Sequence, residues 1–336
     1  MMTFVSRLAA LAAVLTVPGA AVAASPGKVV VAYQTGPDPI EVTFASGALA
    51  KATGRDVEFR KFNSGADIFA AIASGDVQVG YVGSSPFAAA ASRGLDVKAF
   101  YVSSVSGTDE ALVVRNGSGI KSPADLKGKR LSAAPVSTDH YQLLATLKQN
   151  GIAEKDATVL ALAQPEIVAA WNRGDLDGAF VWDPALSELK KTGTVLLTSK
   201  EVAERGAPTF NAWVATAAFI KEDPGFLKSF AGEVARENTS FLENKGAWTA
   251  ESDNVKAIAK LLGGTPQDQA SGLKDVNLLP ASVQATDAWL GGGETSGVAK
   301  ILKDTAGFLK EQRKITAVRD GYGSFVTAEF VTPLSN

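Results

Sequence analysis

The sequence predicts an α/β fold with two lobes, and three observations support this prediction. The chain has 336 residues, about the length of two domains of ordinary size. Short apolar segments alternate with helical segments over most of the chain, which is typical of α/β folds with largely parallel sheets. A helix–Gly-Asp–strand–loop–Pro–helix unit also occurs twice, near residues 75–86 and 174–184. We interpret the two units as homologous lobes that face a shared cleft, although any two strand–helix units resemble each other.

The N-terminal part begins with the strand Lys28–Tyr33, whose apolar run fits a sheet covered on both faces. Glycine ends the predicted helices Asp38–Thr53 and Ala66–Ala73. Pro86 suits the first turn of a helix that continues through Phe87–Ser92. The other strands predicted in this part are Val57–Lys61, Val77–Val82, Val97–Val102 and Ala111–Val114.

The middle of the chain repeats this scheme. Ser122 is a predicted cap, with Pro123 in the first turn of a short helix that ends at Leu126. The other predicted helices are Thr138–Asn150, Glu166–Arg173 and Pro184–Lys191. The predicted strands are Arg130–Ala133, Thr158–Ala161, Ala179–Trp182, Val195–Leu197 and Asn211–Thr216.

Long helical patterns dominate after Phe219, which predicts a helical covering and not a third sheet. These helices are Pro224–Leu242, Asp253–Leu262, Pro266–Leu273, Ser282–Trp289 and Gly297–Gln312.

Composition excludes several functional classes. The 33 basic and 35 acidic residues leave no positive excess to neutralise phosphates, so no nucleic-acid partner is expected. The chain has no cysteine and a single histidine, His140, which excludes disulfides, thiolate metal sites and multi-histidine metal sites. Glycine-rich phosphate-binding motifs and a G-x-S-x-G nucleophile elbow are missing from the sequence. We therefore expect a binding protein with no catalytic residue, no metal and no cofactor; an enzyme acting on a small amino-anion is the alternative.

Residues 1–23 are typical of a cleaved secretory signal peptide. Arg7 precedes the apolar run Leu8–Val17, and Ala21-Val22-Ala23 fits the small-residue cleavage rule. The alternative, a membrane anchor, needs about 20 apolar residues, more than this run contains. Without a cysteine the mature chain cannot carry a lipid anchor, so the sequence predicts a periplasmic protein that is not a lipoprotein.

Two predicted helices start with small hydrogen-bond donors. Gly83-Ser84-Ser85-Pro86 and Ser137-Thr138-Asp139-His140 each follow a strand. Free backbone N–H groups and the helix dipole make such starts suitable for an anion. Ordinary capping of the helix explains the same residues.

The chain resembles the taurine-binding periplasmic proteins of ABC importers over essentially its whole mature length. The stretches that carry the resemblance are Val31–Thr35, Arg60–Ala66, Ala73–Gln78, Gly83–Pro86, Glu110–Val114, Ser137–Tyr141, Ala169–Asp175, Gly206–Thr209 and Phe308–Gln312. The family belongs to a wider group that binds aliphatic sulfonates, nitrate or thiamine precursors. The resemblance implies a type II periplasmic-binding-protein fold, with ligand between two α/β lobes, a twice-crossed hinge and C-terminal helices.

On this pattern the first lobe comprises residues 28–112 and 210–336, and the second comprises residues 113–209. The expected crossings are Val113–Arg115 and Ala207–Asn211. The implied function is capture of taurine, or a related alkanesulfonate, by lobe closure and its delivery to the permease and ATPase of an ABC importer. The resemblance also implies a monomer. Nitrate, a thiamine precursor or an aromatic sulfonate is the alternative ligand.

The resemblance places Gln34, Ser84, Ser85, Thr138 and His140 around the sulfonate or the middle of the ligand, and Glu110 opposite the ammonium. A sulfonate only accepts hydrogen bonds, whereas an ammonium needs acceptors and prefers a carboxylate, so these residue types fit taurine. Trp182 and Trp213 offer ring faces to the cation or pack in the core.

Two positions depart from the family pattern. Asn211 stands where a relative carries aspartate, and Asp183 stands where it carries alanine. Our hypothesis is that the second carboxylate for the amine has moved to Asp183. The alternatives are a cap for the next helix, or a preference for a sulfonate without an amine. For His140, a role in binding predicts an affinity that changes between about pH 5 and 8; a solvated or capping histidine predicts no change.

Overall fold

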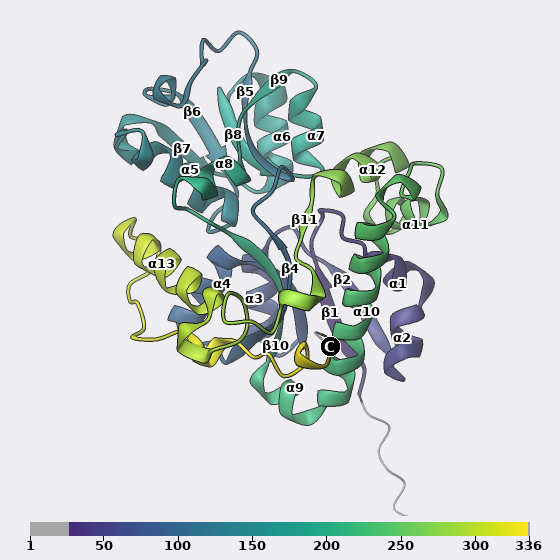
Figure 1. Ribbon diagram of the computed structural model, residues 1–336. Coiled ribbons are helices and arrows are strands. Elements are labelled where there is room, and N and C mark those ends of the chain that lie inside the picture. The colour runs from purple at the N-terminus through teal and green to yellow at the C-terminus, as the bar shows by residue number, and fades with distance from the viewer. Residues whose placement is uncertain (1–26, 335–336) are drawn as a thin grey trace, which may run out of the picture.

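The computed structural model describes residues 27–334, so the predicted signal peptide lies outside the described residues. Figure 1 shows two α/β lobes, one above the other, with the chain passing between them. Within the described range, no helix combines the length and the apolar character that crossing a bilayer requires.

The first lobe contains a sheet of six strands in the order β11-β4-β10-β3-β1-β2. Their bounds are β1 Val29–Tyr33, β2 Val57–Lys61, β3 Val79–Gly83, β4 Val97–Val105, β10 Phe210–Thr216 and β11 Asn277–Leu278. Strand β1 pairs in parallel with β2 and β3, whereas β10 lies antiparallel between β3 and β4. The expectation of largely parallel sheets is therefore wrong: β10 enters from the second lobe and runs opposite to its neighbours.

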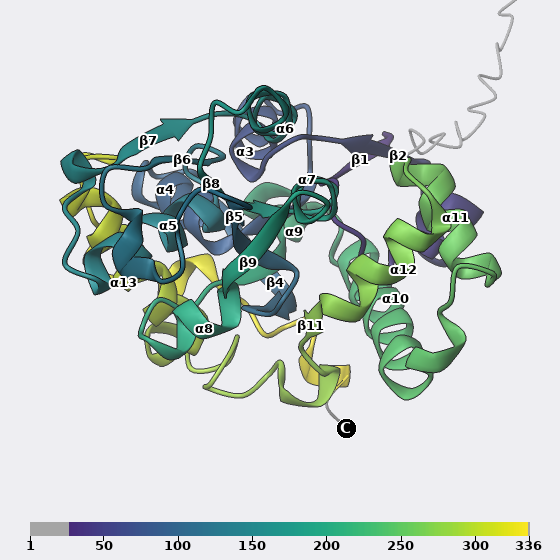
Figure 2. The ribbon, with the colours of Figure 1, turned by 90° about the horizontal axis from the view of Figure 1, so that it is seen from above.

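Helices surround this sheet. They are α1 Glu41–Ser46, α2 Ala48–Thr53, α3 Gly65–Ala73, α4 Ser84–Ser92, α9 Ala217–Glu222, α10 Pro224–Glu243, α11 Asp253–Leu262, α12 Pro266–Asp275 and α13 Gly297–Glu311. Aromatic side chains fill the core, where Trp213 and Phe100 both meet Phe230 of α10 edge to face. Figures 1 and 2 place α13 and the α11–α12 pair on opposite flanks of the molecule.

Two predicted helices of this lobe are wrong. The helix predicted over Asp38–Thr53 is split into α1 and α2, because Gly47 adopts a left-handed conformation with φ 72°. The segment predicted as the helix Ser282–Trp289 forms only a 3₁₀ turn at Ala281–Val283. The buried Gln284 amide accepts from the Val102 backbone N–H at 3.0 Å and donates to the Val102 carbonyl, which holds this segment against the edge of β4.

The second lobe contains a five-stranded sheet in the order β7-β6-β8-β5-β9. The strands are β5 Glu110–Arg115, β6 Arg130–Ala133, β7 Thr158–Ala161, β8 Gly178–Trp182 and β9 Gly193–Thr198; the helices are α5 Thr138–Gln149, α6 Gln164–Arg173, α7 Ala185–Lys190 and α8 Ser199–Glu204. This sheet is mixed as well, because β5 runs antiparallel to β8 and β9. The predicted helix at Ser122–Leu126 is a 3₁₀ turn closed by a capping box between Ser122 and Asp125.

The chain passes between the sheets at residues 106–109 and 205–209. The two segments lie side by side: the Ser106 N–H donates to the Thr209 carbonyl at 3.0 Å, and the Thr209 N–H donates to the Ser106 hydroxyl at 2.8 Å. The first crossing thus precedes the expected Val113–Arg115, because the whole of β5 belongs to the second sheet. Such paired crossing segments allow the lobes to rotate about one axis.

The lobes meet on both sides of the space between them. On one side, Phe308 of α13 packs edge to face on Tyr141 of α5, with ring centroids 5.1 Å apart. On the other side, Trp182 Nε1 at the end of β8 donates to Thr35 Oγ1 at 3.1 Å. Together these contacts describe a closed arrangement of the two lobes.

Candidate functional site

A cavity of about 60 Å³ lies between the lobes, near the hinge. The first lobe contributes residues that follow β1, the end of β3, the start of α4, Asn211 of β10, and Gly272 and Val276 at α12. The second lobe contributes the start of β5, the start of α5 and the end of β8. Because one water needs about 10–15 Å³ on this measure, the cavity holds a few waters or one small molecule.

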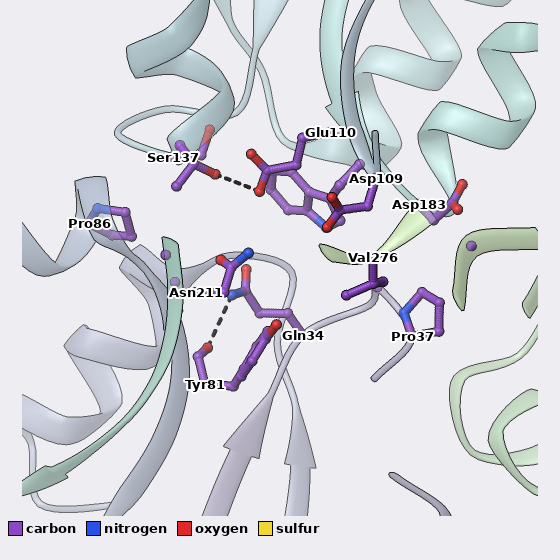
Figure 3. Close-up of a pocket in the computed structure, with 16 residues that line it drawn as sticks. Gln34, Pro37, Tyr81, Pro86, Asp109, Glu110, Ser137, Asp183, Asn211 and Val276 are labelled. Carbon is purple, nitrogen blue, oxygen red and sulfur yellow. Dashed lines mark hydrogen bonds between the residues drawn. The ribbon is translucent and has the colours of Figure 1, made fainter. Parts of the chain in front are cut away.

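The wall from the first lobe is polar but uncharged. Gln34 Nε2 donates to the Tyr81 carbonyl at 3.1 Å, and Asn211 Nδ2 donates to Ser104 Oγ at 3.3 Å. In Figure 3 the side chains of Gln34, Tyr81 and Asn211 lie below the cavity and face the acidic residues above it. This wall offers amide groups for hydrogen bonding.

The wall from the second lobe is acidic, with Glu110 at its centre. Its side chain is 7% exposed, and Thr138 Oγ1 donates to its Oε1 at 2.9 Å. Its Oε2 is buried and has no hydrogen-bond partner among the described residues. Burial raises the pKa of Glu110, against the opposing effect of the hydrogen bond from Thr138. One oxygen of Glu110 is therefore left for a further donor.

Asp109 lies beside Glu110 on the cavity wall, and Asp183 lies further along, past Asp109 (Figure 3). Burial raises the pKa of both carboxyls, and the neighbouring Glu110 raises that of Asp109 further. None of the described residues that line the cavity is a lysine, arginine or histidine. In the described part of the chain, no group of three or more acidic or histidine residues is arranged to hold a metal ion.

Six of the predicted site residues line the cavity: Gln34, Glu110, Thr138, Trp182, Asp183 and Asn211. Asp183 also accepts the Ser187 N–H of α7 through Oδ1 at 2.9 Å. Both alternatives for this residue, a lining carboxylate and a contact with the next helix, are therefore present together.

The two predicted serines lie behind the cavity wall and do not line it. Both are fully buried. Ser84 Oγ accepts the Phe210 N–H at 3.4 Å, and Ser85 Oγ donates to the Val136 carbonyl at 2.9 Å. The second bond joins the two lobes, so Ser85 acts in the contact between them.

His140 and Trp213 are also outside the cavity lining. His140 Nδ1 accepts the Val136 N–H at 3.1 Å, and burial, together with the nearby Lys314 charge, lowers its pKa to about 4. Trp213 is 1% exposed and packs between Phe44 and Phe230 in the core.

Sequence reasoning missed several lining residues. Asp109 precedes Glu110 directly and was detectable as part of an acidic pair. Tyr81 and Gly272 gave no such signal. Gly272 matters because a Cβ atom there would lie 2.7 Å from Asp183 Oδ2 on the opposite lobe.

Residues 51–239, more than half of the chain, match the NMT1/THI5-like family. The chain belongs to this family. It is also 42% identical over 305 residues to the taurine-binding periplasmic protein of Escherichia coli (strain K12), covering 90% of this chain and 92% of the relative. The predicted family resemblance is confirmed.

Solved structures of other binding proteins share the fold. The alkanesulfonate-binding protein SsuA from Xanthomonas axonopodis pv. citri, bound to MOPS, matches with a TM-score of 0.72 and 21% identity, covering 92% of this chain and 99% of that chain. The periplasmic aliphatic sulphonate binding protein SsuA from Escherichia coli matches with a TM-score of 0.70 and 21% identity, covering 90% and 92%. These likenesses confirm the predicted two-lobed fold of the NMT1/THI5-like chain.

Proposed function

We propose that this protein is a periplasmic receptor that binds taurine between its lobes and delivers it to the permease and ATPase of an ABC importer. The observation that carries the proposal is the acidic cavity. Three carboxyl groups line it, while its lining residues include no basic side chain. Glu110 Oε2 has no donor among the described residues. A ligand that brings an ammonium group supplies the missing charge and the missing donor.

The sulfonate end of taurine requires hydrogen-bond donors. The starts of α4 and α5 both reach the cavity, through Gly83 and Pro86 and through Ser137 and Thr138. The positive ends of two helix dipoles favour an anion there without a basic side chain. A zwitterion therefore suits the cavity better than a simple anion or a simple cation.

The proposed mechanism is lobe closure. Ligand that contacts both walls stabilises the closed arrangement relative to an open one, and no bond is made or broken. The 42% identity with the Escherichia coli taurine-binding protein supports the same ligand. Another aliphatic sulfonate is the second candidate, because Asn211 gives the first-lobe wall a neutral amide.

A thermal-shift screen with calorimetry tests the ligand. Taurine is expected to raise the melting temperature more than ethanesulfonate, nitrate or a pyrimidine. A larger shift with ethanesulfonate, which lacks the amine, would reject taurine in favour of the second candidate.

Glu110→Gln tests the role of the carboxylate. We expect taurine affinity to fall about 10- to 100-fold, since a hydrogen bond to a charged group contributes about 1.5–3 kcal/mol. Affinity for ethanesulfonate should change little, because that ligand has no ammonium. Equal losses for both ligands would contradict an ammonium contact at Glu110.

A further inference from the structure

Asp139 is a further carboxyl group of the second lobe, next to Glu110 but outside the cavity lining. It is the second residue of α5, and its side chain is 0% exposed. Neither of its carboxylate oxygens has a hydrogen-bond partner in the described part of the chain. Asp139 does not line the cavity, so ligand does not reach it directly.

The neighbours of Asp139 share this lack of partners. Its carboxyl interacts with the carboxyl of Glu110 on β5 and lies near the amide of Gln164 on α6. Glu110 Oε2 and both amide atoms of Gln164 are buried and unpaired among the described residues. The charges that act on Asp139 are those of Glu110 and Asp109, and no basic group is among them.

Two carboxylates that face each other in a buried region without a cation cannot both be ionised. If one carboxyl keeps its proton, it becomes a donor to the other. Glu110 accepts a hydrogen bond from Thr138, which favours its charged form. Burial and the charges of Glu110 and Asp109 raise the pKa of Asp139 well above its usual value. The proton therefore belongs on Asp139.

We propose that Asp139 is a positioning residue of the ligand site. It stays protonated at neutral pH and donates its O–H to Glu110 Oε2. That oxygen keeps a second lone pair for the ligand, so the bond fixes the Glu110 carboxylate toward the cavity. The role in positioning rests on the proposed function, because it presumes an ammonium at Glu110. The protonation of Asp139 does not rest on that function, since the carboxyls of Asp139 and Glu110 both belong to the second lobe and interact without a ligand.

The consequence is one fewer negative charge behind the cavity wall, next to Glu110, than the number of acidic residues there suggests. As the pH rises and Asp139 loses its proton, Glu110 loses a donor and gains a repelling neighbour. Asp139→Asn supplies an amide donor that does not titrate, and Asp139→Leu supplies none. Asp183→Asn is a matched control that removes a carboxyl from the cavity wall but not from the Glu110–Asp139 pair.

The first test is infrared spectroscopy of the ligand-free protein at pH 7. Because burial also raises the pKa of other carboxyls, such as Glu41 and Asp109, difference spectra are compared. The carbonyl stretch of a protonated carboxylic acid should be present in the wild-type spectrum minus the Asp139→Asn spectrum, and equally in Asp183→Asn minus the Asp139→Asn/Asp183→Asn double variant. Difference spectra without this band overturn the proposal. If the band behaves as expected but taurine does not bind, the proposed function fails and the protonation of Asp139 stands.

The second test is calorimetry with taurine from about pH 6 to 9. Asp139→Asn should bind within about threefold of wild type at pH 7, and Asp139→Leu at least tenfold more weakly. Because the taurine ammonium itself titrates, the informative quantity is the taurine affinity of Asp139→Asn divided by that of wild type. This ratio should increase as the pH rises. A tenfold loss in Asp139→Asn with an unchanged melting temperature overturns the positioning role.

Discussion

Asp183 lies directly after β8, where one of its carboxylate oxygens is already engaged. Oδ1 accepts the Ser187 N–H of α7, while the side chain also lines the cavity. Its Oδ2 points toward Gly272 of the other lobe, near the space that ligand would occupy. The hypothesis that Asp183 supplies the carboxylate missing at Asn211 therefore remains open to test.

Asp183→Asn separates the charge from the contact with α7, because the amide oxygen still accepts the Ser187 N–H. If Asp183 meets the ammonium, taurine affinity in calorimetry should fall about tenfold while the melting temperature stays unchanged. Asp183→Ala should in addition lower stability by about 1 kcal/mol through the lost helix contact. Unchanged taurine affinity in both variants would reject the relocated carboxylate.

His140 affects stability in acid and not ligand binding at neutral pH. Its pKa is lowered to about 4 from 6.5, first by burial and then by Lys314. The unfolded chain therefore binds more protons between these values, and the free energy of unfolding falls as the pH drops through them. Since His140 stays neutral above about pH 5, the affinity change predicted for a binding histidine is not expected.

His140→Asn tests this assignment, because the amide oxygen still accepts the Val136 N–H and does not titrate. Urea denaturation should show that wild type loses about 3 kcal/mol relative to the variant between pH 7 and pH 4. Taurine affinities of the two proteins should run parallel from about pH 5 to 8. The lowered pKa would be contradicted if the free energies of unfolding of the two proteins changed equally with pH, or if their taurine affinities diverged.

At the scale of single elements, β3 and α4 meet the start of α5 across the cleft. Gly83 ends β3 and caps α4, with φ −76°, which any residue adopts. A Cβ atom at this position would lie 2.7 Å from Thr138 Cγ2 of the second lobe. The glycine is therefore required by the approach of the lobes and not by its backbone conformation.

Gly83→Ala should hinder closure while leaving each lobe intact. Overpacking of this kind costs about 1–3 kcal/mol, so taurine affinity should fall at least fivefold in calorimetry. The melting temperature of the ligand-free protein should not change. Gly232→Ala, in the middle of α10 where no atom lies within 4 Å of the added Cβ, is the matched control. Equal affinities for both variants would show that the lobes close less tightly than described.

The same elements show what sequence can predict. Strands such as Val57–Lys61 were predicted to the residue because each is a compact apolar or alternating segment between turn residues. Glu110 and Thr138 were found because family motifs fix positions along the chain. Motifs do not fix the direction of a side chain at a helix start, which is why Ser84 and Ser85 were expected in the cavity. Gly272 lies far along the chain, and only tertiary structure brings it to the site.

At the scale of the whole molecule, α13 spans both lobes. It packs on α4 of the first lobe, and its Phe308 lies against Tyr141 of the second. Glu311 of the same helix pairs with Lys148 of α5 at 2.8 Å. Both partners of this ion pair are more than half exposed, so it contributes little compared with the ring contact.

Phe308→Ala should shift the molecule toward an open arrangement. Losing the aromatic pair costs about 0.5–1.5 kcal/mol beyond the buried area, so taurine should bind several-fold more weakly. Small-angle scattering should show a larger radius of gyration at subsaturating taurine. Glu311→Gln, which removes the exposed ion pair but leaves Lys148 over the Phe308 ring, should change neither quantity measurably. Similar effects of the two substitutions would show that the Phe308–Tyr141 ring contact does not stabilise the closed arrangement.

The acidic cavity also determines which solutes the receptor ignores. Sulfate and phosphate present oxygens like those of a sulfonate, but they carry no positive group to meet Glu110. With no lysine, arginine or histidine among the described lining residues, only the starts of α4 and α5 attract such ions, and no full positive charge offsets repulsion by the carboxylates. We therefore expect a receptor of this design to bind its zwitterion even where inorganic anions are abundant in the surrounding medium.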